Sequence, residues 1–196
     1  MAPAVNETIS IHPVIADRWS PRAYDTDHVL SDSALDTILE AGRWAPSSRN
    51  SQPWRFVVGR RGDSVFKQIF DCLAPVNREW AGSASALIGG VVQLATPEGA
   101  PLNWGLYDVG QAFSHMTFQA HGDGLHARQM AGFDQDALRR TFAIPEDYRP
   151  CVVMAVGRLG TPDGLPERLR AEEGGPRLRH DLNSLTLREG SAGTPW

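Results

Sequence analysis

The run Ala86-Leu-Ile-Gly-Gly-Val-Val-Gln-Leu94 constrains the fold more than any other part of the chain. It is almost continuously apolar and is bounded by polar residues, which is typical of a strand buried on both faces. Such a strand needs other secondary structure packed above and below it. The run therefore predicts a central strand in a sheet that is flanked by helices.

The remaining pattern predicts helices and strands that alternate irregularly. Three further strands are predicted, over residues 54–59, 125–130 and 151–156. Helices are predicted over residues 31–44, 63–73, 77–81 and 103–121, and from Asp134 to just before Pro145. No GxGxxG or GxxxxGK[ST] motif is present, so neither a dinucleotide-binding Rossmann half nor a P-loop is supported. We predict an α+β fold with a small mixed, mainly antiparallel sheet flanked by helices.

The length of 196 residues suits a single domain with arms. Residues 1–14 are expected to be a flexible lead-in, residues 15–160 the domain, and residues 161–196 a carboxyl-terminal arm. Prolines and glycines interrupt this polar arm, but Leu182-Asn-Ser-Leu-Thr-Leu187 alternates as a short strand does. An arm of this kind either embraces a partner chain or is an ordinary surface tail.

Charge and cysteine content exclude several classes of protein. The formal net charge of -4 disfavours general attraction to nucleic acid or to an anionic membrane. Cys72 and Cys151 lie in separate apolar runs and are expected to be buried free thiols. The histidines lack ligand spacing, so no metal site is expected. With no signal peptide and no apolar stretch long enough to cross a bilayer, a cytoplasmic location is expected.

Two pairs of arginines stand near the two ends of the chain. Arg18-Trp-Ser-Pro-Arg22 carries the first pair and Arg177-Leu-Arg179 the second. Residues i and i+2 of an extended segment point the same way, so Arg177 and Arg179 can converge. Converging guanidinium groups match the oxygens of a phosphate monoester. The alternative for either pair is a solvated charged surface.

A third polar segment connects the first predicted helix to the first predicted strand. Between Pro46 and Pro53 it carries several side chains that donate or accept hydrogen bonds, including Ser47, Ser48, Asn50 and Gln52. A plain turn needs far fewer polar side chains. Their groups suit a ribityl chain or the edge of a heterocycle, so the segment is interpreted as one wall of a ligand site.

The order of these segments resembles that of the nitroreductase family of FMN-dependent oxidoreductases. The resemblance starts with Arg18-x-Ser-x-Arg22-x-Tyr and Ala45-Pro-Ser-Ser-x-Asn-Ser-Gln-Pro-Trp54. It continues through Asn77-x-x-Trp80, Tyr107-Asp-Val-Gly110, Gly124-Leu-x-Ala-Arg-Gln-Met-Ala-Gly-Phe133 and Arg177-x-Arg179. Each piece is weak alone, but the ordered set, over roughly residues 15–190, is specific.

The resemblance implies a role for each matching residue. Arg18, Arg177 and Arg179 would hold the FMN phosphate, and Trp19 and Ser20 would line the same site. Arg22 would lie toward the N1 and C2-carbonyl edge of the flavin, where positive charge stabilises the reduced ring.

The ring itself would be contacted by the other matching segments. Asn77 would reach the pyrimidine side, and Ala131 and Gly132 would pass over the ring and offer a backbone N–H to N5. The connecting segment would contact the flavin, in family members often from the opposite subunit, through Pro46, Ser47, Ser48, Asn50 and Gln52. No catalytic side chain is assigned, because the flavin carries the hydride.

The implied activity is a ping-pong reduction of nitroaromatic, quinone or enone-type small molecules by NADH or NADPH. The implied assembly is a homodimer in which the carboxyl-terminal arm adds a strand to the partner subunit. Three alternatives stay open: an FMN-dependent dehydrogenase or flavin-consuming oxidase, a non-catalytic FMN-binding protein, and a scaffold without cofactor.

The chain departs from the family pattern at two places. Residues 96–102 form only a short loop where many members have a helical excursion, so a more open or differently covered substrate pocket is expected. Ala131 stands where some members have an acidic residue.

Overall fold

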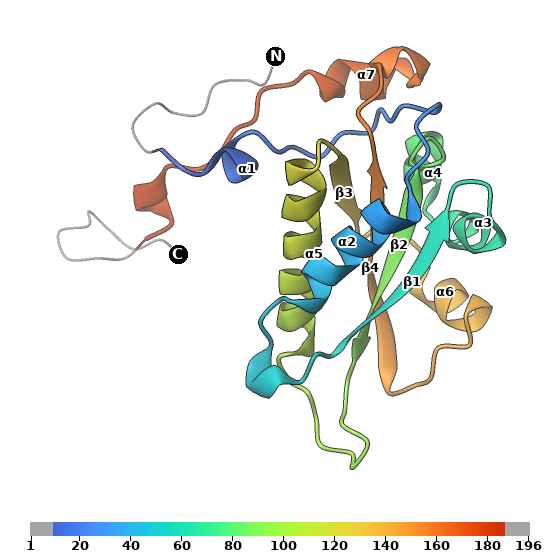
Figure 1. Ribbon diagram of the computed structural model, residues 1–196, viewed down its shortest axis with the longest axis vertical. Helices are drawn as coiled ribbons and strands as arrows, with labels where there is room; N and C mark the ends of the chain where they lie inside the picture. The colour runs from blue at the N-terminus through green and yellow to red at the C-terminus, as the bar shows by residue number, and fades with distance from the viewer. Residues whose placement is uncertain (1–9, 187–196) are drawn as a thin grey trace.

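The computed structural model describes residues 10–186 and shows one sheet within them, with strand order β1-β2-β4-β3 (Figure 1). The strands are β1 (Trp54–Arg60), β2 (Ala86–Gln93), β3 (His126–Met130) and β4 (Tyr148–Gly157). All neighbouring strands in this sheet are antiparallel. Every residue of β2 is buried, as its apolar run predicts. The predicted α+β class with a mainly antiparallel sheet is confirmed.

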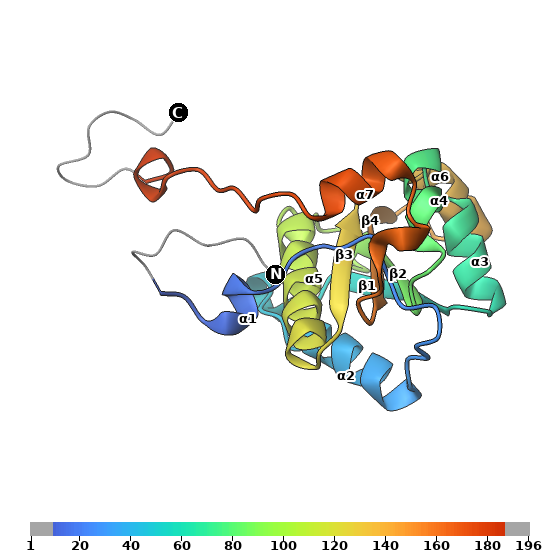
Figure 2. The same ribbon diagram turned by 90° about the horizontal axis from the view of Figure 1, so that it is seen from above.

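Helices cover both faces of the sheet (Figures 1 and 2). One face packs against α2 (Asp32–Arg43) and α5 (Gly105–Gly122), and the other against α3 (Ser64–Asp71), α4 (Pro75–Ala81) and α6 (Gln135–Thr141). The neighbouring residues Leu87 and Ile88 of β2 belong to the two different cores. This division follows from the pleat, since successive side chains of a strand point to opposite faces.

Side-chain caps explain where three of these helices begin. The side chains of Ser31, Asp63 and Asp134 accept hydrogen bonds from backbone N–H groups in the first turns of α2, α3 and α6. These caps satisfy donors that have no partner inside the helix. The predicted helices are confirmed with boundaries shifted by a few residues.

The two ends of the described chain hold elements that the sequence pattern did not predict. These are α1 (Pro13–Ala16), η2 (Pro162–Gly164), α7 (Glu167–Glu173) and η3 (Leu182–Ser184). Beyond α7 the chain leaves the body on the same side as α1 (Figure 2).

No strand forms over residues 182–186 of the single chain, because residues 182–184 form a 3₁₀ turn, and the strand added to a partner subunit stays a prediction. A strand that pairs only with a partner chain has no neighbour to form a ladder in one protomer. Position 187 and most of the predicted lead-in lie outside the described residues.

Candidate functional site

The arginines from the two chain ends meet in one hollow, which we call the arginine pocket. Its volume is about 220 Å³. It is lined by Arg18, Trp19, Ser20, Arg22, Arg128, Glu172, Glu173, Gly175, Arg177 and Arg179. The structure therefore brings together the five residues that the family resemblance places at the phosphate, from segments about 150 residues apart, and Arg22 lines the same hollow.

Arg18 contributes a buried hydrogen-bond donor to the arginine pocket. Its Nε is buried and has no hydrogen-bond partner among the described residues, while Nη2 donates to the Ser20 hydroxyl at 3.4 Å. Burial, and then the charges of Arg177 and Arg179, lower the pKa of Arg18 from its usual value. An anion in the pocket would satisfy the free donor and relieve the repulsion, so these residues fit a phosphate group.

Arg22 lines the same pocket but its charge is already paired. Its guanidinium lies 2.9 Å from a Glu172 carboxylate oxygen and 3.7 Å from a Glu173 carboxylate oxygen. A flavin edge beside Arg22 would therefore meet a largely neutralised group rather than a free cation.

Arg128 is a pocket residue that residue-by-residue reasoning missed. It lies on β3, donates to the Ser20 carbonyl oxygen, and stands over the Trp80 ring at 5.4 Å. Burial and then the charge of Arg22 lower the pKa of Arg128. A sequence signal that could have identified Arg128 is its position inside a short predicted strand that is otherwise mostly apolar.

A second group of predicted residues lies just beyond the end of β3. The Asn77 side-chain amide donates to the Gly132 carbonyl oxygen at 2.9 Å. A Cβ added at Gly132 would lie 2.7 Å from the same amide nitrogen, so glycine allows this approach. Because α4 contacts Arg128 through Trp80 and Gly132 through Asn77, the arginine pocket and this contact share one side of β3. They are about four residues, or ~13 Å, apart along the chain.

The third group is the connecting segment over residues 46–52. Ser48 N–H donates to the buried Asp108 carboxylate at 3.1 Å, and Gln52 N–H donates to Ser47 Oγ at 3.0 Å. Arg49, Asn50 and Gln52 have positive φ angles of 53°, 56° and 45°. Positive φ is uncommon outside glycine, so these bonds hold a strained backbone.

This segment borders a hollow of about 270 Å³, lined by Pro46, Ser47, Ser48, Trp104, Tyr107, Asp108 and Gln111. Trp104, Asp108 and Gln111 were missed as site residues. Asn50 and Gln52 are exposed and do not line the hollow.

The connecting segment and the arginine pocket lie at opposite ends of α5, and Figure 1 shows the connecting segment beside the beginning of this helix. The segment contacts Asp108 in the first turn, whereas Trp19 packs against His126, which packs against His121 in the last turn. The 13 residues between positions 108 and 121 span about 20 Å of helix. One protomer therefore does not place its own connecting segment beside its own arginine pocket.

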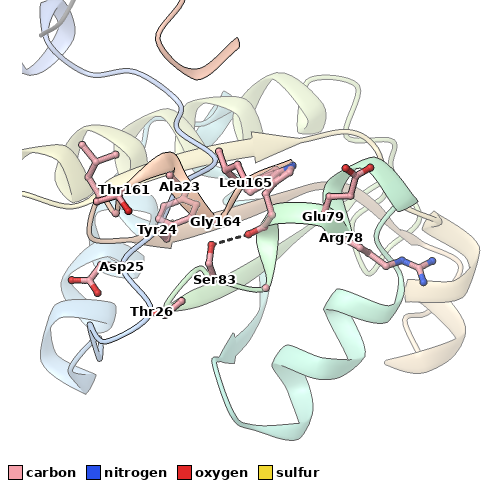
Figure 3. A pocket seen from close by; sticks show the side chains of 14 residues that line it. Ala23, Tyr24, Asp25, Thr26, Arg78, Glu79, Ser83, Thr161, Gly164 and Leu165 are labelled. Carbon is pink, nitrogen blue, oxygen red and sulfur yellow. Dashed lines mark hydrogen bonds between the residues drawn. The ribbon is translucent and has the colours of Figure 1, made fainter. Parts of the chain in front are cut away.

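Figure 3 shows a larger hollow, of about 730 Å³, between the segment over residues 23–26, α4 and the chain after β4. Several of its polar groups are already bonded: Ser83 Oγ donates to the Trp80 carbonyl oxygen at 2.8 Å, and Asp25 pairs with Arg158 at 2.6 Å. Its described lining includes none of the predicted site residues. We therefore assign it no ligand.

Two further findings concern residues 10–186 alone. They contain no group of three or more His, Cys, Asp or Glu side chains arranged to hold a metal ion. They also contain no helix with the length and apolarity needed to cross a membrane.

An antiparallel sheet covered by helices on both faces, with an anion-accepting pocket beside its end strand β3, defines an α+β protein suited to a phosphorylated ligand. The chain belongs to the nitroreductase family, whose model matches residues 15–158. The resemblance stated from the sequence is confirmed.

Relatives agree with this assignment. A solved structure described as an oxidoreductase containing FMN superposes with a TM-score of 0.89 at 32% identity, covering 96% of each chain. A protein of Archaeoglobus fulgidus, provisionally named NADH dehydrogenase/NAD(P)H nitroreductase, is 30% identical over 82% of this chain and 90% of its own. An uncharacterised protein of Mycolicibacterium smegmatis is 33% identical over 68% of this chain and 94% of its own.

Proposed function

We propose that the chain is an FMN-dependent NAD(P)H oxidoreductase that reduces nitroaromatic, quinone or enone-type small molecules. Membership of the nitroreductase family and the FMN-containing structural relative support FMN and a nicotinamide co-substrate. The observation that carries the proposal is the arginine pocket, in which the free Arg18 Nε faces two arginines of the carboxyl-terminal arm.

In this proposal Arg18, Arg177 and Arg179 hold the phosphate, and the Ser20 hydroxyl orients Arg18. Planar guanidinium groups offer paired donors, which suits the tetrahedral oxygens of a phosphate monoester. Trp19 is half-buried and closes one side of the pocket. The chemistry of this donor set therefore fits the headgroup of FMN.

The ring end of the cofactor would lie further along β3, near Asn77 and the backbone of Ala131 and Gly132. Bound FMN supplies a ring that accepts hydride from a nicotinamide and passes it to a second substrate. The residues of this chain bind and orient the ring, and we assign none as an acid or base. Arg22 contributes little net charge there, because Glu172 and Glu173 pair with it.

We also propose a homodimer that holds two FMN molecules. Trp104 caps the beginning of α5 and Tyr107 lies in its first turn; each is 63% exposed, and a twofold partner would cover such large side chains. The partner would also bring its connecting segment, with Pro46, Ser47, Ser48, Asn50 and Gln52, to the cofactor that the arginine pocket holds. This arrangement accounts for the separation of the two groups along α5.

Spectroscopy of the purified protein tests the proposal. We expect a flavin absorption band that is bleached by NADH or NADPH under anaerobic conditions and restored by a nitroaromatic or quinone, with parallel-line ping-pong kinetics. A flavin that neither nicotinamide reduces would instead support the non-catalytic FMN-binding protein, or a dehydrogenase or oxidase that uses another reductant. Protein without any affinity for FMN would leave only the scaffold. The cytoplasmic location stays a prediction.

A further inference from the structure

Glu173 joins the carboxyl-terminal arm to the amino-terminal side of the arginine pocket. It is the last residue of α7, and its side chain is only 6% exposed. Glu173 Oε1 accepts hydrogen bonds from the backbone N–H groups of Arg22, at 2.5 Å, and Ala23, at 3.2 Å. A carboxylate that accepts two backbone N–H bonds while buried is fixed in position, because releasing it would leave those donors unpaired.

This contact limits how far Arg177 and Arg179 can lie from the amino-terminal side of the pocket. Arg177 follows Glu173 by four residues, which limits its distance from the contact to about 14 Å. The arm beyond α7 otherwise leaves the body, as Figure 2 shows. Holding the end of α7 at residues 22 and 23 therefore keeps the arm arginines at a high effective concentration near Arg18.

Glu172 provides a natural comparison beside it. Glu172 also lines the arginine pocket and carries the same charge, but its side chain is 56% exposed and its ion pair is with the Arg22 side chain alone. Both carboxylates lower the positive potential that an anion would meet. Only Glu173 also bonds to the backbone of the opposite wall.

We propose that Glu173 is a positioning residue: by accepting the N–H groups of Arg22 and Ala23, it fixes the arm so that Arg177 and Arg179 complete the anion site. The inference rests on the proposed function for its ligand, but the contact itself exists without the ligand. By positioning the arm, Glu173 should strengthen binding of the anion. Its negative charge alone would weaken that binding, since a carboxylate repels a nearby anion.

Three single substitutions separate position from charge. Glu173→Ala removes the backbone contact and the charge, Glu173→Gln removes the charge but keeps a carbonyl oxygen that can accept both N–H groups, and Glu172→Ala removes the neighbouring charge alone. Titration of apoprotein with FMN should give at least about tenfold weaker binding for Glu173→Ala. Glu173→Gln should stay within about threefold of wild type. Glu172→Ala should bind FMN as tightly as wild type or more tightly, because it removes a negative charge beside the anion. Weakening by Glu173→Gln equal to that by Glu173→Ala would overturn the proposal.

A double-mutant cycle tests whether Glu173 acts through the arm. In a chain that already carries Arg177→Ala and Arg179→Ala, adding Glu173→Ala should weaken FMN binding by less than about threefold, since there are no arm arginines left to place. If the full effect of Glu173→Ala persisted in that background, the arm would not be the route.

Amide hydrogen exchange of the cofactor-free protein tests the contact without FMN. Exchange at Arg22, Ala23 and residues 174–180 should be faster in Glu173→Ala than in wild type, and unchanged in Glu173→Gln and Glu172→Ala. Equal exchange in Glu173→Ala and wild type would refute the contact. A wild-type protein that bound no FMN would refute the proposed function and leave the exchange result to decide the contact. If Glu173→Ala did not fold, Glu173→Asp, which is one carbon too short to reach both donors, should show the same faster exchange.

Discussion

Arg18 shows how a single residue can point to a binding site. Its pKa is lowered by burial and by two neighbouring arginines, and its Nε has no partner in the described chain. A protein rarely keeps a buried donor unpaired among like charges without a functional reason. Arg177 and Arg179 of the carboxyl-terminal arm line the same pocket, and their proposed role in binding can be tested directly.

Changing Arg177 and Arg179 together to Ala should weaken FMN binding by about 3 kcal/mol or more, because each removes charge-assisted hydrogen bonds to the phosphate. Titration of the apoprotein measures this loss. The matched control is Arg168→Ala with Arg170→Ala, which removes two exposed arginines of α7 that pair with Glu79 and Glu167 outside the pocket. Equal losses in both double variants would indicate a general charge effect and not a phosphate site.

His126 should make stability depend on pH. Burial, and then His121 and Arg18, lower its pKa from the usual value of 6.5. The unfolded chain therefore binds more protons than the folded chain at this position once the pH falls to about 6.5 and below, so acid destabilises the fold. Urea unfolding at pH 7.5 and 5.5 should show a smaller loss in His126→Gln than in wild type. His180→Gln, at an exposed position, should retain the wild-type loss.

Cys151 should react slowly with thiol reagents. Burial raises its pKa to about 11, and burial also raises the pKa of Cys72. At pH 8 only about one Cys151 thiol in a thousand is ionised, and the thiolate is the reactive form. A disulfide reagent should therefore modify native protein slowly and both thiols promptly in denaturant. Rapid native modification would contradict this environment.

Sequence reasoning predicted some site residues and missed others for a clear reason. That Arg18, Arg177 and Arg179 lie together was predictable, because spacing and family resemblance both single them out. Arg128, Glu172 and Glu173 were missed because their roles depend on contacts between segments far apart in the chain. Arg22 matched its motif, but the sequence did not reveal its ion pairs with α7.

At the scale of elements, β2 is placed by contacts that tolerate little change. A Cβ added at Gly90 would lie 2.5 Å from the Phe113 ring of α5 and 2.7 Å from Val152, whereas one at Gly89 would lie 3.5 Å from Val57. Gly90 therefore lets α5 approach the sheet. Gly89 faces the other core, where an added Cβ would make ordinary van der Waals contacts. The apolar run made the strand predictable, but not this difference between adjacent glycines.

Gly90→Ala should lower the free energy of unfolding by about 1–3 kcal/mol, the usual cost of overpacking. Gly89→Ala is the control on the same strand and should be neutral or slightly stabilising. Urea denaturation measures both. Equal destabilisation by the two substitutions would show that strand position, and not contact with α5, controls the effect.

The missed elements share a property that explains why they were missed. In α7 only Leu169 is buried, so the helix has no apolar period to detect. The alternation over residues 182–187 favoured a strand, but a strand also needs a neighbour to pair with. Pattern predicts an element reliably when one face is buried within the same chain, as for α2 with Leu35, Ile38 and Gly42.

At the scale of the whole molecule, the surface of α5 allows the proposed dimer to be tested separately from the fold. A Cβ added at Gly110 would meet nothing within 4 Å in the described chain. Gly110→Glu should therefore keep or slightly raise the thermal stability of the protomer, because glycine is a poor helix former. The same charge inside a subunit interface would be costly.

Light scattering should give the mass of two chains for the wild type and of one chain for Gly110→Glu, with weakened FMN binding in the variant. Thr37→Glu, on the exposed side of α2, should remain dimeric with unchanged FMN binding. A monomeric wild type that still binds and reduces FMN would contradict the shared site.

The arginine pocket draws on residues 18 and 179, so synthesis order affects when it can exist. The sheet ends at residue 157, so a nascent chain can form it before the ribosome has added Arg177 and Arg179 to the pocket. If the pocket holds FMN as proposed, a chain cut short before position 177 lacks both arm arginines and should bind the cofactor more weakly than the full chain.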